Sequence, residues 1–112
     1  ISLKLVLPKI KELLAENGEA VVLIKPQFEA GKSNLNKKGV VKDPKVHRQV
    51  INDLTEFATV CGFCVSGLCV SPIKGGTGNA EYLMYLKHKD GNNVPVPFSA
   101  DELVSEALRQ EK

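Results

Sequence analysis

The sequence predicts an α/β protein whose elements run helix, strand, helix, strand, strand and C-terminal helix. Three observations support this fold class. Apolar residues recur with a period near 3.6 over residues 3–14 and 46–61, as on the buried side of an amphipathic helix. Residues 21–24 form an unbroken aliphatic run, which is typical of a strand. Residues 63–70 and 80–88 also have strand composition, and they lie close enough in sequence to pair as an antiparallel hairpin.

The first helix is expected to start after Ser2, a good N-cap, and to stop before Gly18, which suits a left-handed C-terminal position. Pro8 lies inside this pattern, so the helix either is kinked there or begins there. A strand at residues 20–25 follows, and its continuous apolar run predicts burial on both faces. Pro26 ends it, because proline cannot donate to a sheet ladder. Such a strand predicts a larger, mostly parallel sheet on its N-terminal side.

The remaining helices carry recognisable start and stop residues. Asp43 and Pro44 predict the N-cap and first position of the second helix, and Gly62 predicts its end. After the hairpin, a Val-Pro-Val-Pro stretch is expected to be extended. Ser99 and Glu102 then form the pattern of a capping box, which predicts a final helix over residues 100–110.

Size and composition bound the class of protein. The chain has 112 residues, which is one domain at most. Its 43% hydrophobic and 25% charged residues are those of an ordinary globular protein rather than a disordered one. No apolar run approaches the roughly 20 residues that a membrane-spanning helix needs.

The cysteines indicate neither a disulfide framework nor a metal centre. Cys61, Cys64 and Cys69 are odd in number and have apolar neighbours, which favours a reducing cytoplasm and burial as small hydrophobic residues. A redox role is the alternative. The two histidines, His47 and His88, do not stand at zinc-motif spacing, so no metal is expected.

Positive charge is concentrated in one segment. Residues 27–43 read as a long loop, and a loop of this length is usually functional or disordered. Between Ala30 and Arg48 there are six basic side chains and one acidic one. Lysines with few aromatic residues fit contacts to a phosphate backbone, although a merely solvated loop is the alternative. The candidates for phosphate contact are Lys32, Lys37, Lys38, Lys42, Arg48 and Lys74, the last at the edge of a glycine-rich loop.

Two ionisable residues lie where sheet strands meet loops. Lys25 ends the aliphatic run, and Glu81 begins the last strand. Ligands gather at the carboxyl ends of strands in open α/β sheets, so a half-buried lysine there is placed for chemistry. A lysine acts as a general base when burial and other cations lower its pKa, while a carboxylate opposes that shift but orients the amine. The alternatives are a lysine that extends into solvent or a structural salt bridge.

Three segments, residues 23–32, 38–47 and 71–81, closely resemble the TlyA family: Leu-Ile-Lys-Pro-Gln-Phe-Glu-Ala-Gly-Lys, Lys-Gly-Val-Val-Lys-Asp-Pro-Lys-Val-His and Ser-Pro-Ile-Lys-Gly-Gly-Thr-Gly-Asn-Ala-Glu. That family comprises hemolysin A and ribosomal RNA 2′-O-methyltransferases with an FtsJ-like catalytic domain. The resemblance implies a partial Rossmann-like methyltransferase sheet. It implies that residues 1–90 form the C-terminal half of the catalytic domain and that residues 91–112 form a linker and an amphipathic helix.

The resemblance also implies roles for individual residues. The family uses a Lys-Asp-Lys-Glu tetrad around the ribose 2′-hydroxyl, in which Lys25 matches the second lysine and Glu81 the glutamate. Lys25 is then expected to accept the hydroxyl proton, with its pKa lowered by the other lysine. The remaining tetrad residues and the S-adenosylmethionine-binding loop are expected upstream of Ile1, so this chain alone is expected to be inactive.

The function implied is S-adenosylmethionine-dependent 2′-O-methylation of ribosomal RNA in the cytoplasm. Expected partners are ribosomal RNA or ribosomal subunits, without a stable membrane partner. Two alternatives stay open. A hemolysin-like protein would need a membrane-active face, which the sequence does not display. A non-catalytic RNA-binding module would bind RNA in a salt-dependent way through the basic loop without transferring a methyl group.

Overall fold

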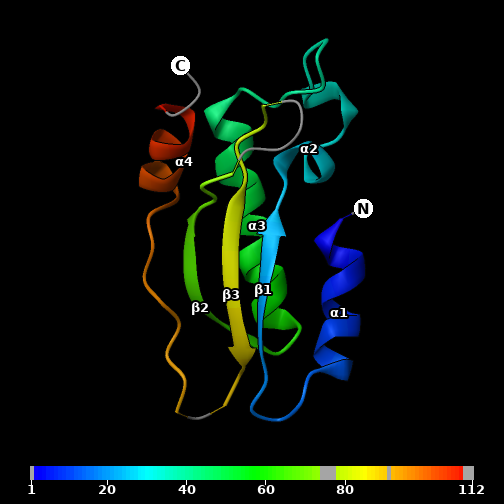
Figure 1. Ribbon diagram of the computed structural model, residues 1–112, viewed down its shortest axis with the longest axis vertical. Helices are drawn as coiled ribbons and strands as arrows, with labels where there is room; N and C mark the ends of the chain where they lie inside the picture. The colour runs from blue at the N-terminus through cyan, green and yellow to red at the C-terminus, as the bar shows by residue number, and fades with distance from the viewer. Residues whose placement is uncertain (1, 74–77, 91, 110–112) are drawn as a thin grey trace.

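The computed structural model describes residues 2–73, 78–90 and 92–109 (Figure 1). Its elements follow the predicted order and confirm the mixed α/β class. They are α1 (Leu3–Leu13), β1 (Glu19–Ile24), α2 (Pro26–Glu29), the 3₁₀ turn η1 (Lys32–Asn34), α3 (Pro44–Val60), β2 (Phe63–Val70), β3 (Tyr82–His88) and α4 (Ala100–Arg109). The short helices α2 and η1 lie in the segment that was predicted to be a continuous loop.

The three described strands form one sheet in the order β1-β3-β2. β3 is antiparallel to both neighbours, so β1 and β2 run parallel to each other on either side of it. The antiparallel pairing of β2 with β3 confirms the predicted hairpin. α3 is the crossover that joins β1 to β2, and Figure 1 shows it behind the sheet.

The core lies between the sheet and α3. Ile51, Leu54 and Ala58 of α3 are fully or almost fully buried, because they share the face that the 3.6-residue period places toward the strands. They pack in one cluster with the inward residues of the sheet, which include Phe63, Val65, Tyr82, Met84 and Leu86. Val104 and Ala107 of α4 join the same cluster, so the C-terminal helix is docked on the body.

The expectation that β1 is buried on both faces is wrong for the described residues. Burial alternates along the strand: Val21 is 63% exposed and Leu23 is 39% exposed, whereas Ile24 is fully buried. The described helices pack against the other face of the sheet, and β1 is an edge strand of it (Figure 1). The aliphatic run therefore presents an apolar stripe to the open face.

The alternative in which the first helix begins at Pro8 is wrong, because α1 runs from Leu3 through Pro8 to Leu13. The Ser2 hydroxyl accepts a hydrogen bond from the Lys4 backbone amide at 3.1 Å, as expected of an N-cap. Gly18 does not take the expected left-handed conformation. It is needed for space instead, because a Cβ there would lie 2.7 Å from Cγ of Leu14.

The second long helix begins and ends as predicted. The Asp43 carboxylate accepts a hydrogen bond from the Lys45 amide at 2.9 Å, and Pro44 occupies the first turn. Gly62 follows the helix with φ of +99°, a conformation that side chains disfavour. At α4, the Ser99 hydroxyl accepts from the Glu102 amide at 3.2 Å, which is one half of the predicted capping box.

Candidate active site

Strand pairing brings Lys25 and Glu81 to the same end of the sheet. Ile24 and Tyr82 face each other in the last pair of β1 and β3. Lys25 directly follows that pair and Glu81 directly precedes it, so both leave the sheet at its upper end in Figure 1. This is the carboxyl end of β1, where α/β sheets place their ligands.

Lys25 does not touch Glu81 directly. It is half-buried at the N-cap of α2, and its Nζ lies 5.5 Å from the centroid of the Phe28 ring. That geometry is a cation–π contact. No ion pair within 4.0 Å joins the two described side chains, although they share one end of the sheet.

The Glu81 carboxylate is held by an amide instead. Glu81 is only 4% exposed, and its Oε2 accepts a hydrogen bond of 2.9 Å from Nε2 of Gln27 on α2. The Oε1 atom of Gln27 is buried without a hydrogen-bond partner among the described residues. Sequence reasoning missed Gln27, because nothing in its neighbourhood shows a contact to a residue 54 positions away.

A carboxylate on α2 anchors this short helix to α1. Glu29 Oε1 accepts a hydrogen bond from the Ser2 hydroxyl at 2.6 Å, and Oε2 accepts one from the Leu3 amide at 2.8 Å. The bonded amide lies in the first turn of α1, where free N–H groups and the helix dipole favour an anion. This contact fixes the element that carries Gln27.

Asn79 ties the basic loop to the start of β3. Its side chain is fully buried, Oδ1 accepts from the Val41 amide at 3.0 Å, and Nδ2 donates to the Gly39 carbonyl at 3.0 Å. His47 adds a second tie, because its Nε2 bonds to the Val41 carbonyl at 2.8 Å and its Nδ1 to the Tyr82 hydroxyl at 2.9 Å. The loop therefore has a fixed path beside Glu81.

The structure places the predicted RNA-contacting residues in three different situations. Four lysines are exposed in the basic loop, residues 27–43, at the same end of the sheet as Lys25 (Figure 1). They are Lys32, Lys37, Lys38 and Lys42. Lys74 lies outside the described residues. Arg48 stands apart from the loop lysines, since it belongs to the first half of α3.

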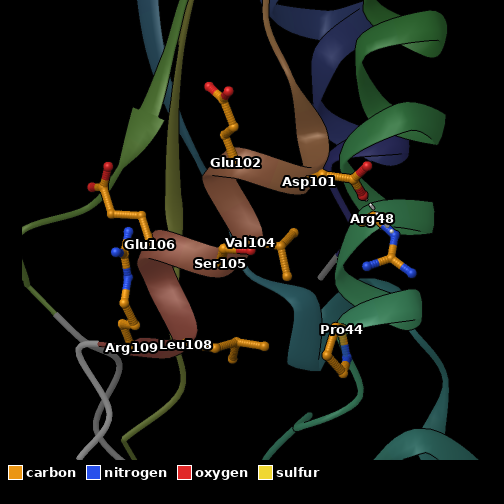
Figure 2. Close-up of a pocket in the computed structure, with 9 residues that line it drawn as sticks. All are labelled: Pro44, Arg48, Asp101, Glu102, Val104, Ser105, Glu106, Leu108 and Arg109. Carbon is orange, nitrogen blue, oxygen red and sulfur yellow. Dashed lines mark ion pairs between the residues drawn. The ribbon is translucent and has the colours of Figure 1, made fainter.

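Arg48 already has a protein partner. Its Nε lies 3.1 Å from Oδ1 of Asp101 at the start of α4. Figure 2 shows the pair beside an open groove of about 800 Å³, which α3 and α4 line with residues that include Pro44, Val104 and Leu108. The charge of Arg48 is thus partly balanced, which makes it a weaker phosphate ligand than the loop lysines.

The cysteines form no metal centre within the described part of the chain. No group of three or more His, Cys, Asp or Glu side chains there could hold an ion. Cys64 is buried and Cys61 half-buried, but Cys69 is exposed. The expectation of burial is therefore wrong for Cys69, which lies at the end of β2 opposite Leu83, on the open face of the sheet.

Residues 1–88 match the sequence profile of the FtsJ-like methyltransferases. The chain belongs to the FtsJ-like methyltransferase family. Among curated relatives, this FtsJ-like chain is 42% identical over 99 residues to Bacillus subtilis YqxC, whose name proposes an rRNA methyltransferase; the match covers 85% of the chain and 35% of that protein. It is 36% identical over 87 residues to the Mycobacterium tuberculosis 16S/23S rRNA (cytidine-2′-O)-methyltransferase TlyA, with coverage of 78% and 32%.

Solved structures of related proteins share this fold. A proposed hemolysin from Streptococcus thermophilus superposes with a TM-score of 0.88 at 42% identity, covering 98% of the chain and 40% of that protein. One from Lactococcus lactis gives a TM-score of 0.85 at 45% identity, covering 95% and 50%. The FtsJ-like chain spans about a third of the length of the curated relatives named above. No helix among its described residues is long and apolar enough to cross a membrane.

The described residues do not fit a binding site for S-adenosylmethionine. A nucleoside cofactor in an α/β sheet is held by a glycine-rich turn between a strand and a helix, where the backbone comes close to the ligand. The turn after β1 contains Lys25 and Pro26 and no glycine, and Pro26 has no N–H to offer. No chemical step through the cofactor is assigned to these residues.

Proposed function

We propose that this chain is the part of an S-adenosylmethionine-dependent ribosomal RNA 2′-O-methyltransferase that carries two of its catalytic side chains. The observation that supports the proposal most directly is the placement of Lys25 and Glu81 at the same end of the sheet in a chain of this family. The rRNA methyltransferase names of the relatives support the substrate. Residues other than those described hold the methyl donor, and the chain alone is inactive.

Lys25 is the residue that takes the proton of the ribose 2′-hydroxyl. A side-chain amine at the end of β1 can approach a hydroxyl there, once the amine leaves the Phe28 ring. Glu81 holds the negative charge that orients the amine. Buried and hydrogen-bonded, this carboxylate has a fixed position, which is the property that an orienting group needs.

The basic loop supplies the contacts to the RNA backbone. Lys32, Lys37, Lys38 and Lys42 are exposed on a segment whose path Asn79 fixes. Such contacts give affinity and orientation without reading the base sequence. Arg48 and Lys74 complete the proposed RNA-binding set. The ion pair with Asp101 weakens the contribution of Arg48 to RNA affinity.

We also propose how the chain is divided into parts and where in the cell the protein acts. Residues 1–90 are the C-terminal half of the catalytic domain, and residues 91–112 are a linker and a helix packed onto it through Val104 and Ala107. The relatives' ribosomal RNA substrates support a cytoplasmic location.

The test is transfer of labelled methyl groups from S-adenosylmethionine to ribosomal RNA by the full-length gene product. Unmodified naked RNA and assembled subunits are offered separately, and the product is mapped for 2′-O-methyl nucleotides. Label at a ribose 2′ position supports the proposal. RNA binding that weakens with salt but gives no label supports an RNA-binding module instead, and leakage from liposomes without label supports a hemolysin.

A further inference from the structure

We infer that Gln27 is a positioning residue of the active site, which fixes the Glu81 carboxylate through one side-chain amide. The inference rests on the proposed function for its kinetic readout. Gln27 Nε2 donates to Glu81 Oε2 at 2.9 Å, across 54 residues of sequence. Glu81 is 4% exposed, so this bond forms where water competes little for the carboxylate.

The chemistry of the pair sets the orientation of the amide. An ionised carboxylate only accepts hydrogen bonds, so the amide must turn its NH₂ group toward Glu81. Its oxygen then has to point elsewhere, and Oε1 is buried without a partner among the described residues. The contact to Glu81 is therefore the hydrogen bond that the Gln27 side chain makes among the described residues.

The backbone that carries Gln27 is itself held. α2 has four residues and could not stay helical alone. Glu29 bonds it to the first turn of α1, and Pro26, which is buried, starts it with the right backbone angle. The Gln27 amide therefore lies on a fixed helix that begins immediately after Lys25. One short segment thus carries both the Lys25 amine and the amide that bonds to Glu81.

Three variants of the full-length gene product separate positioning from general folding. Gln27→Met keeps the length of the side chain but removes the donor. Gln27→Glu keeps an acceptor oxygen and replaces the donor by a carboxyl group. Gln49→Met is the matched control, because Gln49 makes the same kind of bond, Nε2 to Asp53 Oδ1 at 3.0 Å, on the exposed surface of α3.

Gln27→Met is expected to lower kcat about ten- to a hundredfold, the effect of losing one hydrogen bond to a charged group, with KM for RNA changed much less. Gln27→Glu is expected to be no better than Gln27→Met at neutral pH, because a second carboxylate offers no donor to Glu81 and repels it. Gln49→Met behaves as the wild type.

A Gln27→Met variant with the kcat of the wild type overturns the inference, as does a loss that falls on KM for RNA instead of on kcat. If the wild type transfers no methyl group, the proposed function fails and the inference is judged by NMR alone. The ¹³C signal of the Glu81 carboxyl, assigned by its absence in Glu81→Gln, then changes its chemical shift in Gln27→Met and not in Gln49→Met if Gln27 bonds to it. An unchanged chemical shift in Gln27→Met contradicts the inference.

Discussion

His47 and Tyr82 hold α3 to the start of β3 through a fully buried hydrogen bond of 2.9 Å between Nδ1 and the phenolic oxygen. The two rings meet edge to face, with centroids 5.9 Å apart. The other ring nitrogen of His47 bonds to the Val41 carbonyl. One imidazole thus connects the helix, the basic loop and the strand that begins next to Glu81.

Replacing His47 by Leu is expected to destabilise the protein by about 2–5 kcal/mol. The change removes the hydrogen bonds of His47 to the Tyr82 hydroxyl and to the Val41 carbonyl in the interior, and the loss of each buried bond costs about 1–3 kcal/mol. Denaturant unfolding of the full-length gene product measures the loss. Tyr82→Phe and the double variant complete a cycle, and a coupling energy near zero would contradict a direct bond between the two side chains.

Removing charge from the basic loop is expected to weaken RNA binding without changing the rate at saturating RNA. Lys37→Gln, Lys38→Gln and Lys42→Gln each delete one phosphate contact, and each lowers the slope of log affinity against log salt by about 0.7–0.9. Filter binding over a salt series measures the slope. Arg48→Gln changes it less, because Asp101 already balances that charge. Equal effects of Arg48→Gln and Lys38→Gln would argue against this ranking.

Asn79→Ala is expected to weaken RNA binding although it removes no charge. The loop loses its two side-chain hydrogen bonds to Val41 and Gly39, so ordering its lysines on RNA carries a larger entropic cost. The salt slope stays near that of the wild type, since the number of phosphate contacts is unchanged. Asn34→Ala, which removes a local side-chain bond to the Ala30 carbonyl, is the matched control. A lower salt slope in Asn79→Ala would show that contacts themselves were lost.

The phenol of Tyr85 is predicted to ionise at higher pH than an ordinary tyrosine. Its hydroxyl donates a hydrogen bond to the Glu19 carboxylate, which raises the pKa of Tyr85 above 10.0, with desolvation and repulsion from the carboxylate acting in the same direction. Glu19→Gln removes the anion and should therefore lower this pKa. Ultraviolet titration of tyrosinate measures it, and Tyr85→Phe identifies the signal. A transition that does not move in Glu19→Gln would contradict the contact.

The sequence predicted those features of the fold that depend on neighbouring residues. Ser2, Asp43 and Pro44 mark helix starts through bonds within one turn, and Gly62 marks a helix end through its own backbone angle. The hairpin was predictable because its two strands are close in the chain. Its residues pair antiparallel as expected.

Features that depend on distant contacts were not predictable from one sequence. An aliphatic run like that of β1 occurs in strands that are buried on one face and in strands that are buried on both. The exposure of Val21 could therefore not be predicted. Gln27 is an ordinary residue until its contact with Glu81 is seen. Gly18 avoids a clash with the Leu14 side chain, which the backbone preferences of glycine do not predict. Lys25 and Glu81 were predicted as site residues because a charge at a strand end is visible in sequence and because they match two residues of the TlyA-family tetrad.

The measurement that tests the account most directly is methyl transfer to ribosomal RNA by the full-length gene product carrying Lys25→Ala. Lys9→Ala, on the exposed side of α1, is the matched control. We expect that the wild type and Lys9→Ala label a ribose 2′ position, while Lys25→Ala stays folded and gives no label. If Lys25→Ala keeps activity within about tenfold of the wild type, a difference of roughly 1.4 kcal/mol in the barrier, Lys25 is not the base.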